Sequence, residues 1–247
     1  MRLLILGGTA EARRLAEAVA ARAGIAATVS LAGATGDPRP FPVPTRIGGF
    51  GGAAAQAEWI ETHRIDAVID ASHAFAREIG PRTAGLCAGR GLPFLRLVRP
   101  GWVPAPGERW TRIAHPAEAA SLIPEDARIF LATGRQSLPG FAALAGRALW
   151  CRVVDPPALP FPWPGGAWLT GRPPFPESGE VGLFRRLGID WLVAKDAGGD
   201  AGRTKLEAAR ALGLGVALLD RPPLPPGPVV ATVEGALDWL DGLGAAE

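Results

Sequence analysis

The chain has 247 residues, of which 48% are hydrophobic and 20% charged, with a net charge of +2. This length and balance are typical of a globular protein with a sizeable core, and exclude a disordered segment or a small disulfide-stapled domain. No run of five or six cations occurs, so no nucleic acid partner is expected, although the dispersed arginines allow a small polyanionic ligand.

The two cysteines, Cys87 and Cys151, lie far apart and outside any CxxC or zinc-type spacing. We therefore expect reduced thiols, no disulfide framework, no metal site and a cytoplasmic protein. The longest uncharged stretch, residues 156–171, is broken by prolines, so we expect no membrane-spanning helix.

The first half alternates short apolar segments with segments rich in Ala, Leu and Arg, a pattern typical of parallel strands joined by helices. We expect strands at 2–6, 26–31, 45–47, 67–70 and 93–97, and helices at about 10–23, 53–62 and 75–89. A Pro- and Gly-rich crossover at 99–109 then ends the first domain, which spans residues 1–100.

The second half, residues 109–247, repeats the alternation after this crossover. We expect strands near 128–132, 148–153, 167–169, 191–194 and 216–219, helices near 176–187, 204–212 and 233–243, and an irregular proline-rich strap at 155–176. The predicted fold is α/β, with two Rossmann-like or flavodoxin-like doubly wound lobes, parallel sheets and an interlobe cleft. In such folds ligands bind at the carboxyl ends of the strands.

A glycine turn follows the first predicted strand. Gly7, Gly8, Thr9 and Glu11 lie where this strand ends and the first helix begins. Glycine lets a ligand approach the backbone and a helix N-terminus offers N–H donors to a phosphate, so these residues are candidate cofactor ligands. The alternative is a tight turn that needs glycine only for its backbone angles.

The end of the second predicted strand carries no acidic residue. NAD-dependent folds place a carboxylate there to bind the ribose hydroxyls, and it would repel the 2′-phosphate of NADP. Here Ser30 and Thr35 supply hydroxyls and Arg39 supplies a positive charge. If a dinucleotide binds, NADP is favoured; otherwise this is only a strand and a loop.

Polar and aromatic side chains follow the strand at 67–70. Asp70 ends this strand, and Ser72, His73 and Phe75 come next. His73 is the catalytic candidate because an imidazole can exchange protons near neutrality, while Ser72 and Phe75 are candidate substrate contacts. Asp70 and Ser72 can equally be caps of the following helix.

Further loops carry candidate contacts. Gly49 and Phe50 belong to a glycine cluster where backbone can touch a flat ligand and Phe50 can stack on it, although a linker has the same composition. The turn Thr133-Gly134-Arg135 is the second half's equivalent of the first glycine turn, and its arginine can pair with a phosphate or carboxylate.

The densest group of polar residues lies between Lys195 and Lys205, the only two lysines of the chain. A glycine-rich loop before a helix start, with three cations, suits a phosphate or carboxylate ligand. The candidates for binding the substrate are Lys195, Gly198, Gly199, Arg203, Thr204 and Lys205, with Arg172 at a further edge of the cleft. The alternative is helix capping with surface cations.

In this order, the motifs resemble the precorrin-6A reductase family of cobalamin biosynthesis, which acts on precorrin-6A or cobalt-precorrin-6A. The resemblance rests on Ile5–Thr9 with Glu11, Arg46–Gly52, Asp70–Ala76, Gly171–Arg172 with Phe175, and Lys195–Lys205, which span nearly the whole chain. It implies an oxidoreductase that uses NADPH to reduce the carboxylate-rich precorrin-6A ring to precorrin-6B, by hydride transfer to the macrocycle. It also implies hand-over of the ring to other enzymes of the pathway.

The resemblance leaves three alternatives open: whether the ring carries cobalt, whether water, His73 or another acid supplies the proton, and which half binds the cofactor pyrophosphate. Ser72 and Ala74 replace the threonine and proline of the family pattern, and Ala197 replaces a serine whose role must pass to the backbone. The absence of tyrosine excludes short-chain dehydrogenases and sugar-nucleotide epimerases. The remaining rival is a non-catalytic two-lobed binding protein for an anionic nucleotide or tetrapyrrole.

Overall fold

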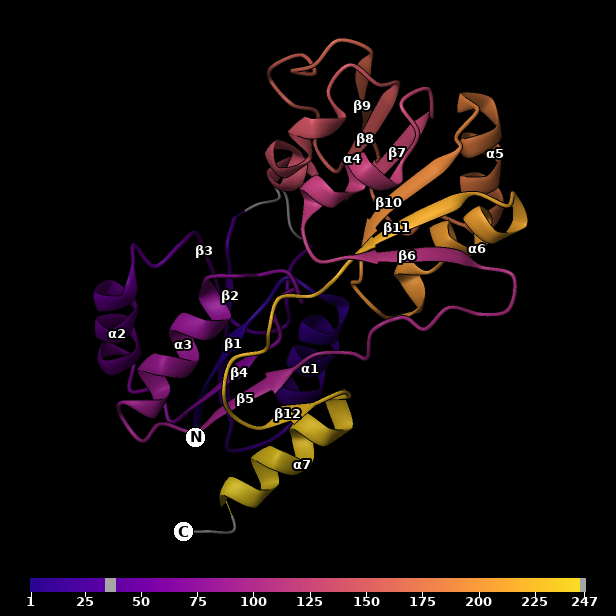
Figure 1. Cartoon of the computed structure of the whole chain (residues 1–247). Helices are drawn as coiled ribbons and strands as arrows, with labels where there is room; N and C mark the ends of the chain where they lie inside the picture. The colour runs from indigo at the N-terminus through magenta and orange to yellow at the C-terminus, as the bar shows by residue number, and fades with distance from the viewer. Residues whose placement is uncertain (34–38, 245–247) are drawn as a thin grey trace. The chain divides into compact units, whose positions relative to one another are not determined.

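The structure is a computed structural model that describes residues 1–33 and 39–244. The chain forms two units, Met1–Pro100 with Pro222–Glu247, and Gly101–Arg221 (Figure 1). Each unit holds a six-stranded sheet whose neighbouring strands are parallel. The predicted α/β class, with a parallel sheet in each half, is confirmed, while the predicted cleft stays a prediction.

The sheet of the first unit has the order β12-β5-β4-β1-β2-β3. Its strands are β1 (Arg2–Leu6), β2 (Ala26–Leu31), β3 (Thr45–Ile47), β4 (Ala67–Asp70), β5 (Phe94–Leu97) and β12 (Val229–Val230). Its helices are α1 (Ala10–Ala20), α2 (Ala53–Thr62), α3 (Ile79–Ala88) and α7 (Val233–Gly244). The helix predicted from residue 75 begins later, at Ile79, which places Pro81 in its first turn, where a missing N–H is tolerated.

Helices cover both faces of this sheet. Leu3 and Ile5 of β1 pack in one buried cluster with residues of α1 and α7, whereas Leu4 and Leu6 pack in another with residues of α2 and α3. Successive side chains of a strand point to opposite faces, so a continuous apolar strand requires a helix layer on each side. This arrangement buries β1 at the centre of the sheet.

The sheet of the second unit has the order β6-β11-β10-β7-β8-β9. Its strands are β6 (Arg109–Ile113), β7 (Ile129–Ala132), β8 (Leu149–Val153), β9 (Gly166–Thr170), β10 (Trp191–Lys195) and β11 (Gly215–Leu219). Its α-helices are α4 (Ala119–Leu122), α5 (Glu177–Leu187) and α6 (Thr204–Ala211), and 3-10 helices span Pro116–Glu118, Arg135–Leu144 and Asp200–Gly202. Phe184 of α5 and Leu206 of α6 pack with Phe130 of β7 in one buried cluster.

The chain returns to the first unit after Arg221, which corrects the second predicted domain, residues 109–247. The physical reason is strand pairing, because Val229–Val230 pair with Arg96–Leu97 and α7 packs against α1. Neither β6 nor β12 was predicted. Among the helices within residues 1–33 and 39–244, none is long and apolar enough to cross a membrane.

Candidate active site

The strand order of the first unit creates a switch point between β1 and β4. The chain leaves β1 towards β2 and β3 on one side, then returns to pair β4 with the other side of β1. Ligands of doubly wound sheets bind outside the carboxyl ends of the strands at such a point. Gly7 and Gly8 follow β1 there, and Ser72 and His73 follow β4.

The glycine turn after β1 is closely packed on one side and open on the other. Gly7 donates its N–H to Ser30 O at 2.8 Å, and a Cβ on Gly7 would lie 2.9 Å from Val29 Cγ1. Gly8 has a φ of +122°, and a Cβ there would meet no atom within 4 Å. The turn therefore needs glycine for two different reasons, and at Gly8 the backbone is open to a ligand.

Thr9 and Glu11 brace the start of α1. The Thr9 hydroxyl accepts the Ala12 N–H at 3.1 Å and donates to Ala71 O at 2.8 Å, which ties α1 to the loop after β4. Glu11 is buried and forms ion pairs with Arg14 at 2.9 Å and with Arg99 at 2.7 Å. Both residues, which were predicted as candidate cofactor ligands, lie at the switch point. Their polar atoms, however, already have protein partners.

Arg46 begins the glycine-cluster motif but was not among the predicted site residues, and it organises the ends of β2 and β3. Arg46 donates to Ser30 Oγ at 2.8 Å, Gly48 O at 2.9 Å and Gly49 O at 3.1 Å, and its guanidinium lies 3.8 Å from the centre of the Phe50 ring. Burial lowers the pKa of this guanidinium. Arg46 thus holds Ser30 and the glycine cluster together at one edge of the sheet.

Of the two remaining cofactor candidates near β2, Thr35 lies outside the described residues. Arg39 is exposed, and its carbonyl oxygen accepts from Arg13 Nη2 at 2.8 Å.

A buried ion pair holds the loop after β4. Asp70 and Arg96 lie 2.5 Å apart and are almost fully enclosed, and Arg96 also donates to Ser72 Oγ at 3.0 Å. The N–H of Phe75 donates to His73 Nδ1 at 3.2 Å, so this ring nitrogen serves as an acceptor. The structure therefore brings Ser72, His73 and Phe75 together in one braced loop.

The second unit has its own switch point, between β7 and β10. The turn Thr133-Gly134-Arg135 follows β7, and the loop that begins at Asp196 follows β10. The Thr133 hydroxyl is buried and has no hydrogen-bond partner among the described residues, while Gly134 has a φ of +78°. The two loops that the sequence predicted for this half therefore follow neighbouring strands.

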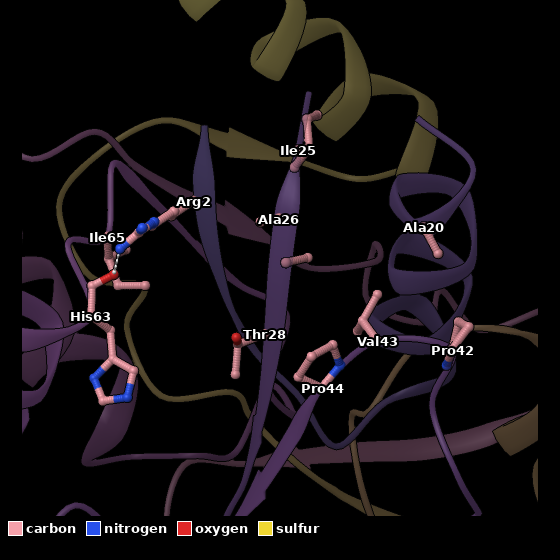
Figure 2. Close-up of a pocket in the computed structure, with 11 residues that line it drawn as sticks. Arg2, Ala20, Ile25, Ala26, Thr28, Pro42, Val43, Pro44, His63 and Ile65 are labelled. Atoms are coloured by element: carbon pink, nitrogen blue, oxygen red, sulfur yellow. Dashed lines mark hydrogen bonds between the residues drawn. The ribbon is translucent and has the colours of Figure 1, made fainter. Parts of the chain in front are cut away.

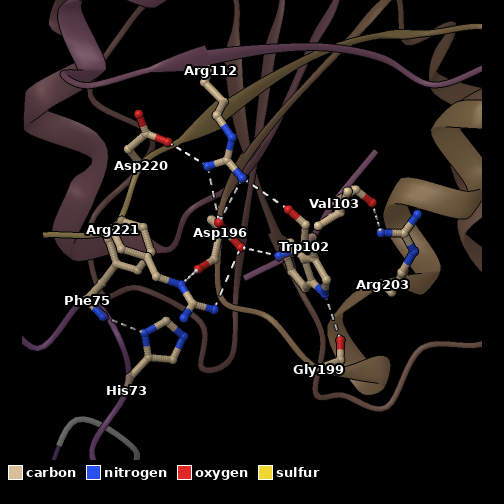
Figure 3. A network of polar contacts seen from close by, with 10 residues as sticks. All are labelled: His73, Phe75, Trp102, Val103, Arg112, Asp196, Gly199, Arg203, Asp220 and Arg221. Atoms are coloured by element: carbon tan, nitrogen blue, oxygen red, sulfur yellow. Dashed lines mark hydrogen bonds and ion pairs between the residues drawn. The ribbon is translucent and has the colours of Figure 1, made fainter. Parts of the chain in front are cut away.

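Asp196 is the centre of a polar network in this unit (Figure 3). Its carboxylate accepts the Trp102 N–H at 2.9 Å and both Nη groups of Arg112 at 3.2 Å, and lies 3.7 Å from Arg221 Nη2. Arg112 also pairs with Asp220 at 2.6 Å, and this hydrogen bond raises the pKa of the guanidinium. The network ties the residues just after Pro100 and just before Pro222 to the loop after β10.

The predicted substrate cations after β10 have partners inside the unit. Arg203 Nη2 lies 2.9 Å from both carboxylate oxygens of Glu108, and its Nε lies 2.8 Å from Glu207. Lys205 donates to Gly202 O, and its ammonium lies 4.9 Å from the Trp102 ring centre.

The other predicted residues of this loop occupy its two ends and its turn. Lys195 ends β10, Gly198 and Gly199 have φ values of +68° and +74°, and Thr204 begins α6. Elsewhere in the unit, Arg172 pairs with Asp155 at 2.5 Å on the surface.

Phe175 lies near a second buried ion pair. The Arg152 guanidinium is 4.0 Å from the Phe175 ring centre, and it pairs with Glu180 through two contacts of 2.6 Å. Because Glu180 is buried, this pair fixes the start of α5 against β8.

A shallow cavity of about 400 Å³ lies in the first unit, at the opposite end of the sheet (Figure 2). It is lined by residues at the amino ends of the strands, among them Arg2, Ala26 and Pro44. Because ligands of this fold bind at the carboxyl ends, we do not assign this cavity to the candidate site.

Two parallel sheets, each with a glycine turn at its switch point, define a doubly wound α/β protein. Residues 2–241 match the family model described as Precorrin-6x reductase CbiJ/CobK, and the chain belongs to this family. The resemblance seen in the sequence motifs is thereby confirmed.

Individual relatives support the same assignment. The chain is 47% identical over 246 residues, 98% of both chains, to the precorrin-6A reductase of Rhodococcus erythropolis, and 42% identical to that of Rhodobacter capsulatus over 99% of this chain and 97% of the relative. A solved structure titled CobK precorrin-6A reductase superposes with a TM-score of 0.92 at 42% identity, covering 98% of this chain and 96% of that one.

Proposed function

We propose that this chain is an oxidoreductase of cobalamin biosynthesis that reduces precorrin-6A to precorrin-6B with NADPH. The observation that carries the proposal is the 47% identity over 98% of both chains with a relative named precorrin-6A reductase. The two glycine turns at switch points of parallel sheets agree with it, since this is where such folds bind nucleotides.

The residues at the first switch point fit a dinucleotide. Gly8 leaves room at the backbone, and α1 begins at the next residue but one, so its first N–H groups are suited to a pyrophosphate. Ser30 near the end of β2 and Arg46 of the neighbouring β3, in place of an acidic residue, favour the 2′-phosphate of NADPH. When bound, NADPH would supply the hydride.

The chain's own part in the reaction is to bind and orient the reactants. The cations and glycines of the loop after β10, together with Arg172, Phe50 and Phe75, are the proposed contacts of the carboxylate-bearing ring. His73 is the proposed group near the reacting carbon, with water or another acid as the alternative proton source. We also propose a cytoplasmic enzyme that hands its product to later enzymes of the pathway.

The test is to mix the protein with NADPH and precorrin-6A and follow the near-ultraviolet absorbance of NADPH. Oxidation that depends on both protein and precorrin-6A supports the proposal, and repeating it with cobalt-precorrin-6A and with NADH defines both specificities. Binding of both ligands without oxidation would instead leave a non-catalytic binding protein.

A further inference from the structure

A buried arginine holds the backbone of the loop after β4. Arg96 of β5 lies opposite Asp70 of β4 in the pairing of these two strands and forms an ion pair with it, and only 3% of Arg96 is exposed. Its guanidinium donates to Ser72 O at 3.1 Å and His73 O at 3.4 Å, while the Asp70 carboxylate accepts the Ser72 N–H at 3.0 Å. Ser72 is therefore fixed through both its N–H and its carbonyl oxygen.

The same arginine determines what the Ser72 hydroxyl can do. Arg96 Nη1 lies 3.0 Å from Ser72 Oγ, and a guanidinium N–H can only donate. The hydroxyl is thus the acceptor in this contact, and its own proton must point elsewhere. Among the hydrogen bonds within residues 1–33 and 39–244, none is donated by the Ser72 hydroxyl.

The other hydroxyl at this switch point behaves differently. Thr9 accepts from Ala12 N and donates to Ala71 O, so both its donor and its acceptor capacities are used inside the protein. Thr9 and Ser72 flank the same point between β1 and β4, yet only Ser72 keeps a proton to donate to a ligand.

We propose that Arg96 is a positioning residue that fixes the Ser72 hydroxyl as a hydrogen-bond donor to an anionic oxygen of the bound ligand. That oxygen belongs either to a carboxylate of the tetrapyrrole substrate or to a phosphate of the cofactor. Donation by the guanidinium polarises the hydroxyl, which favours a charged acceptor. The identity of these ligands rests on the proposed function, whereas the direction of the hydrogen bond rests on the geometry alone.

The first test compares Ser72→Ala with Ser72→Thr, which keeps a hydroxyl. Loss of a hydrogen bond to a charged group weakens binding by about tenfold or more. If the acceptor is a substrate carboxylate, Ser72→Ala raises the KM for precorrin-6A by about that factor, with kcat changed by less than about twofold. If it is a phosphate, the dissociation constant of NADPH rises instead, and Ser72→Thr restores the affected constant in either case. Both constants unchanged in Ser72→Ala would overturn the proposal.

The second test asks whether Arg96 acts through Ser72. Arg96→Lys keeps the charge that faces Asp70 but cannot reproduce the planar fork. If Arg96 does act through Ser72, the double variant Arg96→Lys, Ser72→Ala should bind the affected ligand no more weakly than the weaker-binding single variant. If the losses of affinity in the two single variants instead multiply in the double variant, the coupling between Arg96 and Ser72 is overturned. If Arg96→Lys does not fold, the pair of Ser72 variants still decides the direction of the hydrogen bond.

Thr83→Ala is the matched control. Thr83 is a buried hydroxyl of the same unit that accepts from Gln56 at 2.7 Å and donates to Ile79 O at 2.6 Å, so its loss should lower stability and leave both ligand constants within about twofold. NADPH binding is measured by fluorescence without turnover. A wild-type protein that binds NADPH but never oxidises it with precorrin-6A would refute the proposed function, while the Ser72 comparison could still support or overturn the hydrogen bond.

Discussion

Replacing Asp196 by alanine should strongly destabilise the second unit. The carboxylate is 3% exposed, accepts the Trp102 N–H and both Nη groups of Arg112, and faces Arg221. Alanine would leave the Trp102 N–H without its acceptor and would remove a negative charge from between two arginines. Both effects penalise the folded state, because buried polar groups without partners cost free energy.

Breaking a buried ion pair costs about 3–5 kcal/mol. Arg112 is 46% exposed and keeps its contact with Asp220, so we expect the lower end, about 3 kcal/mol. This is a large part of the roughly 5–15 kcal/mol that stabilises a typical domain. Asp196→Asn keeps an acceptor for the Trp102 N–H and should cost less, about 1–2 kcal/mol.

Urea unfolding followed by tryptophan fluorescence measures these differences. With a slope of about 2 kcal/mol per molar urea, a loss of about 3 kcal/mol lowers the midpoint by about 1.5 M. The control is Asp155→Ala, because Asp155 pairs with Arg172 at 2.5 Å but both side chains are exposed, so the cost should stay below about 1 kcal/mol. Equal midpoints for the Asp196 and Asp155 variants would refute the reasoning that burial gives the network its strength.

Further predictions test other features of the structure. Gly7→Ala should destabilise the first unit by about 1–3 kcal/mol, since its Cβ would lie 2.9 Å from Val29 Cγ1, and an unchanged melting temperature would contradict this close packing. Burial raises the pKa of Cys87 to about 11 and that of Cys151 to about 12, so both thiols should react slowly with a disulfide reagent at about pH 8 unless the protein is unfolded. Because these pKa values are higher in the folded state, the free energy of unfolding should fall as pH rises from the ordinary thiol range towards about 11, and urea titrations over that range would detect it. His73→Ala should slow turnover if the imidazole meets the ring, and full activity would leave His73 a packing role.

Strands of the first sheet were predicted closely because local patterns define them. β1, β2, β3 and β4 begin and end where expected, since a glycine, proline or charged residue lies at each end of these short runs or within two residues of it. The two missed strands lack such a signal. Arg109–Ile113 is a partly exposed edge strand with two arginines, and Val229–Val230 has only two residues and depends on pairing with β5.

The sequence indicated where candidate ligands gather but not how their charges are paired. Glycine turns at strand ends are local features, whereas Arg203 pairs with Glu108, 95 residues away, and Arg96 holds Ser72, 24 residues away. Such pairs depend on which segments become neighbours, which no local pattern reveals. One signal was available, because Arg96 interrupts an otherwise apolar strand and buried arginines require partners. The ligand roles of the candidate residues stay predictions.

Because the chain returns to the first unit after Arg221, the two units cannot complete their folding in the order in which they are translated. Ala236 and Leu240 of α7 are enclosed in the core of the first unit, beside strands made more than a hundred residues earlier. Until α7 has been translated, only α1 covers its face of the first sheet and that apolar layer is incomplete, whereas Gly101–Arg221 already contains every strand of its sheet. The second unit can therefore complete its folding before the first, in contrast to the usual order in which N-terminal domains fold before later ones.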